Sequence, residues 1–410
     1  MKKSILFIAL SLIVFSCKEQ QTIDTPSVDF VNNKKAAGLV EADTRFGLEL
    51  FSEVVSMDEA PENIMISPVS VAVALGMTYN GAEGDTKTAF EETLRFSGYS
   101  REEINTIHQA LINHILQADP KVIMEIANSI WYRQGFNVLQ SFIDTNTLYY
   151  NAEVAGLDFG DPAAKDIINN WCAVKTHDKI KDVLDYISPE AVMYLINAIY
   201  FNGTWTYQFD EKDSYTGTFT KEDNSQTDAR YMKMQTDIAY LSNELFSAVD
   251  LPYGNGKFSM SVLLPKPGKT TNDIVEQLSL SNFTNWTSGF SEKEVIVTLP
   301  KFKFGYKELL NKPLIDMGLG IAFNDMADFT DINPSGNLSI SRVIHQSFID
   351  VNEKGTEAAA VTVVEIRYTS VGPEDGVFYF NADHPFVFVI REKTSNAILF
   401  IGRVSNPEYL

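Results

Sequence analysis

One segment near the C-terminus, residues 353–366, carries two conflicting structural signals. Its three consecutive alanines at 358–360 favour a helix. The residues from Val361 to Ile366 are mostly β-branched and favour a strand instead. With a period of two residues, the small and apolar side chains share one face, namely Thr356, Ala358, Ala360, Thr362, Val364 and Ile366. The segment can therefore enter a sheet as a strand, although its position predicts an exposed loop.

This segment resembles the hinge and reactive-centre loop of the serpins, a family of suicide-type protease inhibitors. The hinge residues are Glu353, Gly355, Thr356, Glu357, Ala358, Ala359, Ala360 and Thr362. Further segments resemble other serpin motifs in the expected order along the chain: residues 63–70, 197–205, 299–304, 384–386 and 400–407. The resemblance covers the chain from about residue 41 to its end.

The distribution of periodic patterns indicates an α+β protein. Helical spacing recurs in the first half, where Ser67 and Pro68 provide a cap and a favoured first residue for a helix that ends at Asn80-Gly81. Strand-like alternation dominates the second half, as in residues 258–264 and 295–299. The resemblance implies the serpin fold, a single domain with three β-sheets, about nine helices and an exposed reactive-centre loop.

The resemblance also implies structural roles for residues around the large central sheet. We expect Ser67 and Ser70 to lie beneath the point where the sheet opens, and His345 to meet Asn197 of a neighbouring strand there. Trp205 is expected at the top of the sheet. Lys301 and Glu353 resemble an ion pair that fixes the base of the loop, although each could also be a solvated charge.

The N-terminus is typical of an export signal. Lys2 and Lys3 precede an apolar run that is shorter than a membrane span. Residues 14–17 then resemble a bacterial lipobox, with Cys17 as the lipidated residue; the alternative is an ordinary secreted protein. We expect a signal peptide at 1–16, a polar tether at 17–40 and the serpin domain at 41–410. The anchor would place the protein on a bacterial cell envelope, most plausibly at the outer membrane.

Composition excludes several classes of function. The formal net charge of −21 argues against a nucleic-acid partner, because phosphates require Lys and Arg. Only five histidines occur, and the common catalytic, metal-binding and phosphate-binding motifs are missing. We therefore expect no enzymatic activity, no metal and no cofactor. The only other cysteine, Cys172, has apolar neighbours and is expected to be a buried hydrophobe in a monomer without disulfides.

The resemblance implies that a serine protease cleaves the loop and is trapped when the loop inserts into the sheet. Counting from the hinge places the cleaved bond between Thr369 and Ser370. The loop is longer than in typical relatives, so Arg367 and Tyr368 remain alternative sites. These residues suit trypsin-like, chymotrypsin-like, elastase-like or subtilisin-like proteases. The rival hypothesis is a non-inhibitory surface lipoprotein that binds a partner and uses the fold passively.

Overall fold

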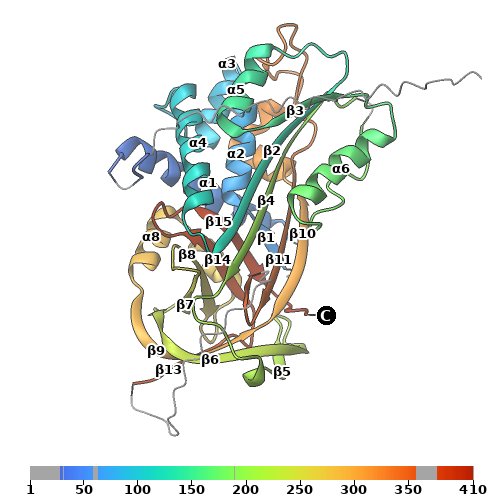
Figure 1. Cartoon of the computed structure of the whole chain (residues 1–410). Helices are drawn as coiled ribbons and strands as arrows, with labels where there is room; N and C mark the ends of the chain where they lie inside the picture. The colour runs from blue at the N-terminus through green and yellow to red at the C-terminus, as the bar shows by residue number, and fades with distance from the viewer. Residues whose placement is uncertain (1–27, 31, 59–62, 189, 357–375, 410) are drawn as a thin grey trace, which may run out of the picture.

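The computed structural model describes residues 28–30, 32–58, 63–188, 190–356 and 376–409. Within them the chain forms nine α-helices, mostly in the first half as expected (Figure 1). The helices are α1 (Lys34–Ser56), α2 (Pro68–Tyr79), α3 (Gly84–Thr93), α4 (Arg101–Gln117), α5 (Gln140–Tyr150), α6 (Ala163–Lys175), α7 (Thr271–Glu276), α8 (Leu280–Ser288) and α9 (Asn311–Leu314).

The first helix starts within the segment that sequence analysis assigned to a polar tether, residues 17–40. Asn33 caps α1 by accepting hydrogen bonds from two backbone N–H groups, and the helix starts at Lys34. Leu39 and Val40 are buried in the main core. The folded body therefore begins before residue 41. Sequence analysis missed this start because the helix begins with two lysines, Lys34 and Lys35. The apolar side chains of α1 show helical spacing only when the whole helix is considered.

One sheet has six strands in the order β10-β11-β12-β4-β2-β3. The strands are β2 (Val122–Arg133), β3 (Glu153–Leu157), β4 (Met193–Thr204), β10 (Phe302–Leu309), β11 (Ile344–Asn352) and β12 (Gly355–Thr356). Helix α2 packs on one face of this sheet, where Ile199 and Phe201 join the main core. Helix α6 covers the other face, where Trp171 and Cys172 pack against Ile196 in a second cluster.

The other nine strands form a hydrogen-bonded sheet that consists of two parts. The strands are β1 (Ile64–Ile66), β5 (Tyr215–Thr220), β6 (Gln226–Ser242), β7 (Phe246–Tyr253), β8 (Phe258–Pro265), β9 (Ser291–Pro300), β13 (Phe378–Asn381), β14 (Phe386–Glu392) and β15 (Ile398–Val404). Strand β6 pairs with β7 only over residues 239–242, where the two parts meet. The part β1-β15-β14-β8-β7 and the part β5-β6-β9-β13, taken with the six-stranded sheet, make the three expected sheets.

Burial agrees with the patterns that predicted these elements. Every residue of β8, β14 and β15 is buried, as expected for apolar strands that are covered on both faces. Cys172 is 1% exposed, and burial raises the pKa of its thiol to about 12. The described helices include none that is both long and apolar enough to span a bilayer.

Candidate functional site

The six-stranded sheet contains a seam between β4 and β11. The two-residue strand β12 lies between them and pairs with both, through Gly355 and Thr356. Among the described residues, no backbone hydrogen bond joins β4 directly to β11. The remaining facing edges of these two strands therefore carry backbone groups that a further strand could pair with. Figure 1 shows β4 and β11 running along the same face of the molecule.

Glycines allow β12 to enter this seam. Gly355 has a φ of +155°, and a Cβ atom there would lie 2.0 Å from the carbonyl oxygen of Gly203. A Cβ atom at Gly203 would in turn lie 2.8 Å from ring carbons of Phe201 and Tyr253. Neither position has room for a side chain, because backbone and packed rings surround both. The predicted hinge glycine is therefore required by the close approach of β12 to β4.

Thr356 already faces the protein interior. Its side chain is 3% exposed, and its Oγ1 lies 2.5 Å from the hydroxyl of Tyr253. The Tyr253 ring is fully buried, and this burial raises the pKa of its phenol well above the usual value. The phenol therefore stays protonated and can donate a hydrogen bond at the end of the seam.

Trp205 connects β4 to the chain on the other side of the seam. Its indole Nε1 donates to the carbonyl oxygen of Asn352 at 2.9 Å, and its backbone N–H donates to Lys354 at 2.9 Å. Its ring stacks on Tyr253 with the centroids 4.3 Å apart. Trp205 therefore lies at the end of β4 that adjoins β12, and it holds the turn that leads into β12.

Glu353 and Lys301 form the predicted ion pair. Lys301 Nζ lies 3.1 Å from Glu353 Oε2, and both side chains are largely buried. Ser214 donates a second hydrogen bond to Oε1 at 2.7 Å, and the N–H of Phe209 donates to the Glu353 carbonyl at 3.0 Å. Burial alone raises the pKa of Glu353, but the hydrogen bonds from Ser214 and Lys301 outweigh it and lower the pKa. The carboxylate therefore fixes the turn before β12 in its ionised form.

The residues expected beneath the sheet opening meet at the start of α2. The Ser67 side chain caps α2, and its backbone N–H donates to His345 Nε2 at 3.2 Å. Ser70 donates from its hydroxyl to Asn197 Oδ1, and Asn197 donates to Asn128 at 2.6 Å. The start of α2 therefore contacts both sides of the seam.

The expected direct contact between His345 and Asn197 is corrected by this arrangement. No hydrogen bond joins the two side chains, because β4 and β11 are not paired here and α2 supplies a separate partner to each. Burial lowers the pKa of His345 to about 4. The imidazole is thus neutral at physiological pH, with Nε2 as the acceptor and the proton on Nδ1.

A segment that sequence analysis missed crosses the seam on the outer face. His177, which follows α6, lies 3.1 Å from Glu125 of β2 and packs on the ring of Tyr200 of β4. Two residues later, the ammonium group of Lys179 lies 5.2 Å from the ring centroid of Phe348 on β11. The segment therefore contacts both sides of the seam, although its sequence has no motif that predicts this.

Several predicted site residues lie outside the described part of the chain. They are the hinge residues Glu357, Ala358, Ala359, Ala360 and Thr362, the loop residues Arg367, Tyr368, Thr369 and Ser370, and Cys17. The described residues contain no group of three His, Cys, Asp or Glu side chains placed to hold a metal ion. The arrangement that remains is a seam between two described strands that are not paired with each other, with the short strand β12 at one end.

Comparisons with known proteins agree with this geometry. A family model described as serpin (serine protease inhibitor) matches residues 41–407. An uncharacterized serpin-like protein of Methanosarcina acetivorans is 35% identical over 95% of this chain and 92% of its own. The human leukocyte elastase inhibitor is 33% identical over 90% of this chain and 99% of its own.

Solved structures show the same fold. The native state of the thermophilic serpin tengpin superposes with a TM-score of 0.82 at 31% identity, over 90% of this chain and 94% of tengpin. Human thyroxine-binding globulin superposes with a TM-score of 0.82 at 25% identity, over 92% of this chain and 100% of the globulin. The chain therefore belongs to the serpin family.

Proposed function

We propose that this serpin inhibits serine proteases by a suicide mechanism. The observation that carries the proposal is the seam between β4 and β11, which β12 enters with Thr356 already buried in it. In this mechanism the protease cleaves the loop and forms an acyl-enzyme. The loop then inserts into the seam as a full strand and carries the attached protease along. Loop insertion as strand addition is a general property of serpins.

The length of the loop supports the mechanism. The fourteen residues from Thr356 to Thr369 would span roughly 45 Å as a strand. Oxyanion donors act only within about 3 Å of the reacting oxygen. A displacement of tens of ångströms would pull the catalytic serine of the protease, with its acyl group, away from these donors. Hydrolysis of the acyl-enzyme would then stop. The protease is then held as a covalent complex.

The residue types in the hinge support fast insertion. Thr356 faces inward, so Ala358, Ala360 and Thr362 would follow it on the same face of an inserted strand. Small side chains on that face require little rearrangement of the neighbouring strands. Serpins without inhibitory activity lose this small-residue hinge, which the present chain retains.

The proposed bond lies between Thr369 and Ser370, with cleavage after Arg367 or Tyr368 as alternatives. We therefore propose more than one target class among trypsin-like, chymotrypsin-like, elastase-like and subtilisin-like enzymes. One curated relative is named as an inhibitor of leukocyte elastase. Mass spectrometry of the C-terminal fragment released on cleavage would identify the bond. A fragment that starts outside residues 368–371 would contradict this assignment.

A panel of serine proteases tests the mechanism directly. The intact chain is mixed with each protease, and the products are separated in denaturing detergent after boiling. A covalent complex of the summed mass supports the proposal. The matching control is the same protease with its catalytic serine replaced by alanine, which cannot form an acyl-enzyme. Thyroxine-binding globulin has this fold and carries a ligand, so cleavage without any complex would favour the alternative of a passive binding protein.

We further propose that Cys17 carries lipid and anchors the protein to a bacterial envelope, most plausibly the outer membrane. Residues 1–16 would be the signal peptide, and the tether would end before α1. Replacement of Cys17 by alanine, followed by cell fractionation, tests this proposal. A variant that stays in the membrane fraction would rule out the lipobox.

A further inference from the structure

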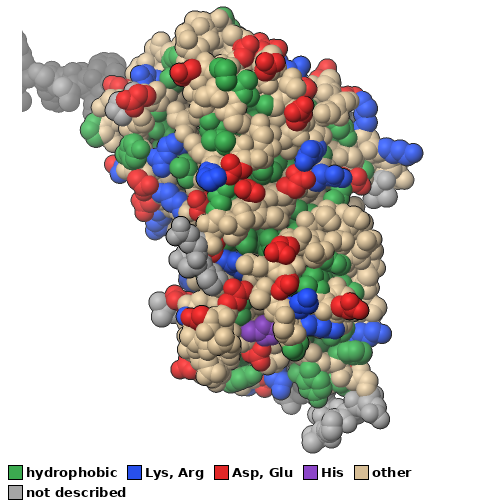
Figure 2. Space-filling model, turned by 180° about the vertical axis from the view of Figure 1, so that it is seen from behind, with side chains coloured by type: hydrophobic (Ala, Val, Ile, Leu, Met, Phe, Trp, Pro, Cys, Tyr) green, Lys and Arg blue, Asp and Glu red, His purple; other side chains and the backbone are tan. Residues whose placement is uncertain are grey.

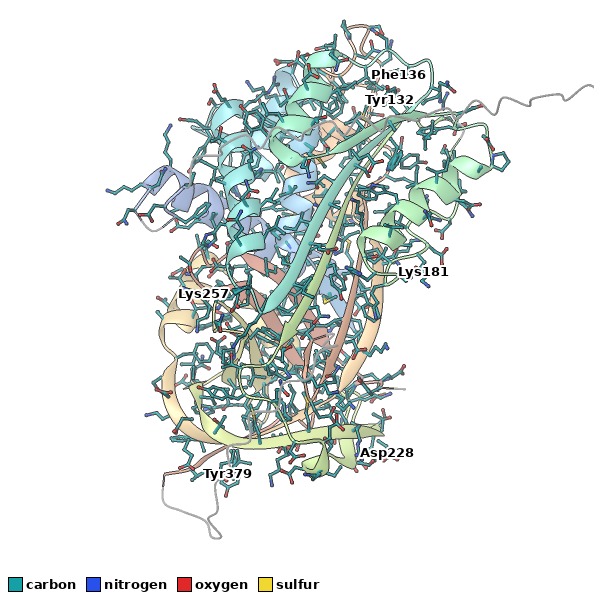
Figure 3. All side chains as sticks on the ribbon, viewed as in Figure 1. Tyr132, Phe136, Lys181, Asp228, Lys257 and Tyr379 are labelled. Atoms are coloured by element: carbon teal, nitrogen blue, oxygen red, sulfur yellow. The ribbon has the colours of Figure 1, made fainter. Side chains whose placement is uncertain are left out.

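Strand β13 presents two aromatic side chains close to the point where the described chain resumes at Gly376. Phe378 is 39% exposed and Tyr379 is 65% exposed. Figure 3 shows Tyr379 at the lower end of the molecule, beside the start of β13. Scattered exposed apolar residues are normal, but a large aromatic side chain on a rigid sheet is a frequent anchor of protein interfaces.

The two rings lie on opposite faces of β13. Phe378 packs against Tyr240 with ring centroids 5.1 Å apart, and Phe380 on the same face is 1% exposed. Phe378 is thus explained by the packing of the sheet. Tyr379 points the other way, to solvent, and its exposure has no such explanation in the fold.

Tyr379 forms a strip with residues on the two neighbouring strands. It lies opposite Ile296 of β9, which in turn lies opposite Gln235 of β6. Ile296 is half-buried, and the Gln235 amide donates to Glu294 at 2.8 Å. We call Tyr379, Ile296 and Gln235 the β13 strip. Its position is fixed by backbone ladders on β9, so little conformational entropy would be lost when a partner covers it.

We propose that the β13 strip is a second contact surface for the protease that takes the reactive loop, and that it raises the rate at which particular proteases are captured. The inference rests on the proposed function, because it assumes that a protease engages the loop. The strip would select among proteases by their outer surface, whereas the loop selects by the cleaved bond.

Chain length brings that protease within reach of the strip. Phe378 follows Ser370 by only eight positions, so the proposed bond lies at most about 29 Å from the start of β13. A protease domain of roughly 200 residues has a radius of gyration of about 16 Å, hence an outer radius of about 20 Å. A protease centred over the loop therefore overlaps the region above the strip.

The charges around the strip suit a protein partner better than a lipid surface. Exposed Lys233 lies on one side of Gln235 along β6, and exposed Asp237 lies on the other beside Glu294. An anionic membrane surface would require a cluster of basic residues. An apolar centre with charges of both signs at its rim is the usual composition of a protein interface. Figure 2 shows that acidic and basic side chains are also interspersed over the rear face.

The test compares Tyr379→Ala with the wild-type chain in two assays. One assay measures the second-order rate constant for covalent complex formation with each protease that is trapped. The other measures the Kd for the same proteases with the catalytic serine replaced by alanine. We expect Tyr379→Ala to lower the rate constant about tenfold and to weaken the Kd by a similar factor for at least one protease. The stoichiometry and the cleaved bond should not change, because the loop and the seam are intact.

Two control variants complete the experiment. Tyr379→Phe keeps the ring and should stay within about twofold of the wild type. Tyr132→Ala removes a half-buried tyrosine at the opposite end of the molecule and should leave both assays unchanged (Figure 3). If Tyr379→Ala traps every target as fast as the wild type does, the strip is not a contact surface. If the wild-type chain traps no active protease and binds no inactive one, the proposed function fails as well.

Discussion

The two sheets of this serpin are held together in different ways. In the nine-stranded sheet, β14 pairs along its length with β15 on one side and β8 on the other, and all its residues are buried. In the six-stranded sheet, β11 pairs fully with β10 but reaches β4 only through the two residues of β12. The first sheet has a continuous backbone ladder, whereas the second depends on side chains at the seam.

This difference matters for what each sheet can do. Opening the nine-stranded sheet would break backbone hydrogen bonds and expose apolar surface. Opening the seam would instead break mainly side-chain contacts, such as those of Trp205, Glu353 and His345. Each of these contributes on the order of 1 kcal/mol. The molecule therefore combines a sheet whose strands pair directly with a sheet that contains, within its described residues, an unpaired seam between β4 and β11.

Cleavage of the loop should give the largest effect. Cleavage within residues 367–370 frees the loop to fill the seam, pair its backbone and bury apolar side chains. At roughly 25 cal/mol per Å² the apolar part alone amounts to several kcal/mol. We expect the midpoint of thermal unfolding to rise by about 10 °C or more, although cleavage normally loosens a protein. Calorimetry before and after complete cleavage measures this. An unchanged or lower midpoint would mean that the seam does not accept the loop.

A cavity made by mutation in the nine-stranded sheet should lower the free energy of unfolding by the same amount whether or not the loop has been cleaved. Ile401 of β15 is fully buried, and Ile401→Ala should lower the free energy of unfolding by about 2–5 kcal/mol. We expect the same loss in the intact and the cleaved chain, measured by urea unfolding of both. A loss confined to one form would show that the two sheets are coupled and would invalidate the comparison.

The pH dependence of stability should also differ between the sheets. The pKa of His345 at the seam is lowered by burial to about 4, so between about pH 4 and pH 6.5 the unfolded chain binds a proton there while the folded chain does not. Its neutral form thus favours folding above pH 6.5, and this contribution is lost as the pH falls from 6.5 to 4. The change amounts to at most about 3 kcal/mol.

Glu392 in the nine-stranded sheet titrates in a lower range. Burial raises the pKa of its carboxyl, but hydrogen bonds from His114, Thr394 and Ser395 lower it to about 2. Its contribution is present above pH 4.5 and lost only as the pH falls from 4.5 towards 2. Urea unfolding at several pH values measures this. His345→Gln should lack the fall in stability between pH 6.5 and 4, and Glu392→Gln should lack the fall between pH 4.5 and 2. If His345→Gln keeps the loss between pH 6.5 and 4, then His345 is not its source.

A large effect on inhibition is expected for Thr356→Arg, together with some loss of stability because Thr356 is already buried in the intact chain. An unpaired guanidinium is costly to bury beside Tyr253, so strand insertion should stall while hydrolysis of the acyl-enzyme continues. The variant should fold, be cleaved at the same bond and release active protease. We expect at least ten times more inhibitor to be consumed per trapped protease, as measured by titration.

Glu357→Arg is the matched control, because residue 357 would lie on the opposite face of an inserted strand. It should cause much less loss of inhibition. Cleaved Thr356→Arg should also lack the rise in thermal midpoint. If this variant traps protease with wild-type stoichiometry, insertion through this hinge is not the mechanism.

The sequence by itself determined those elements whose signals lie within the element, such as helix caps and side-chain periodicity. The cap at Ser67 and Pro68 correctly predicted the start of α2, and Asn80 its end. Strand-like alternation predicted β8 and β9, because buried strands need apolar side chains on one or both faces. The alternation of small residues from Thr356 onward identified a segment able to form a strand, and with five other segments it indicated the family.

Only the tertiary structure decided which partners these residues have. Tyr253 lies 103 residues from Thr356, and Ser214 lies 139 residues from Glu353. Neither partner has a local signal, because each contact depends on how segments that are far apart in the sequence pack together. For the same reason His345 accepts a hydrogen bond from Ser67 and none from Asn197. The segment with His177 and Lys179 contacts both sides of the seam, and no sequence motif predicts this. Side-chain periodicity fixes which face of a strand a residue occupies, but only three-dimensional packing fixes what it touches there.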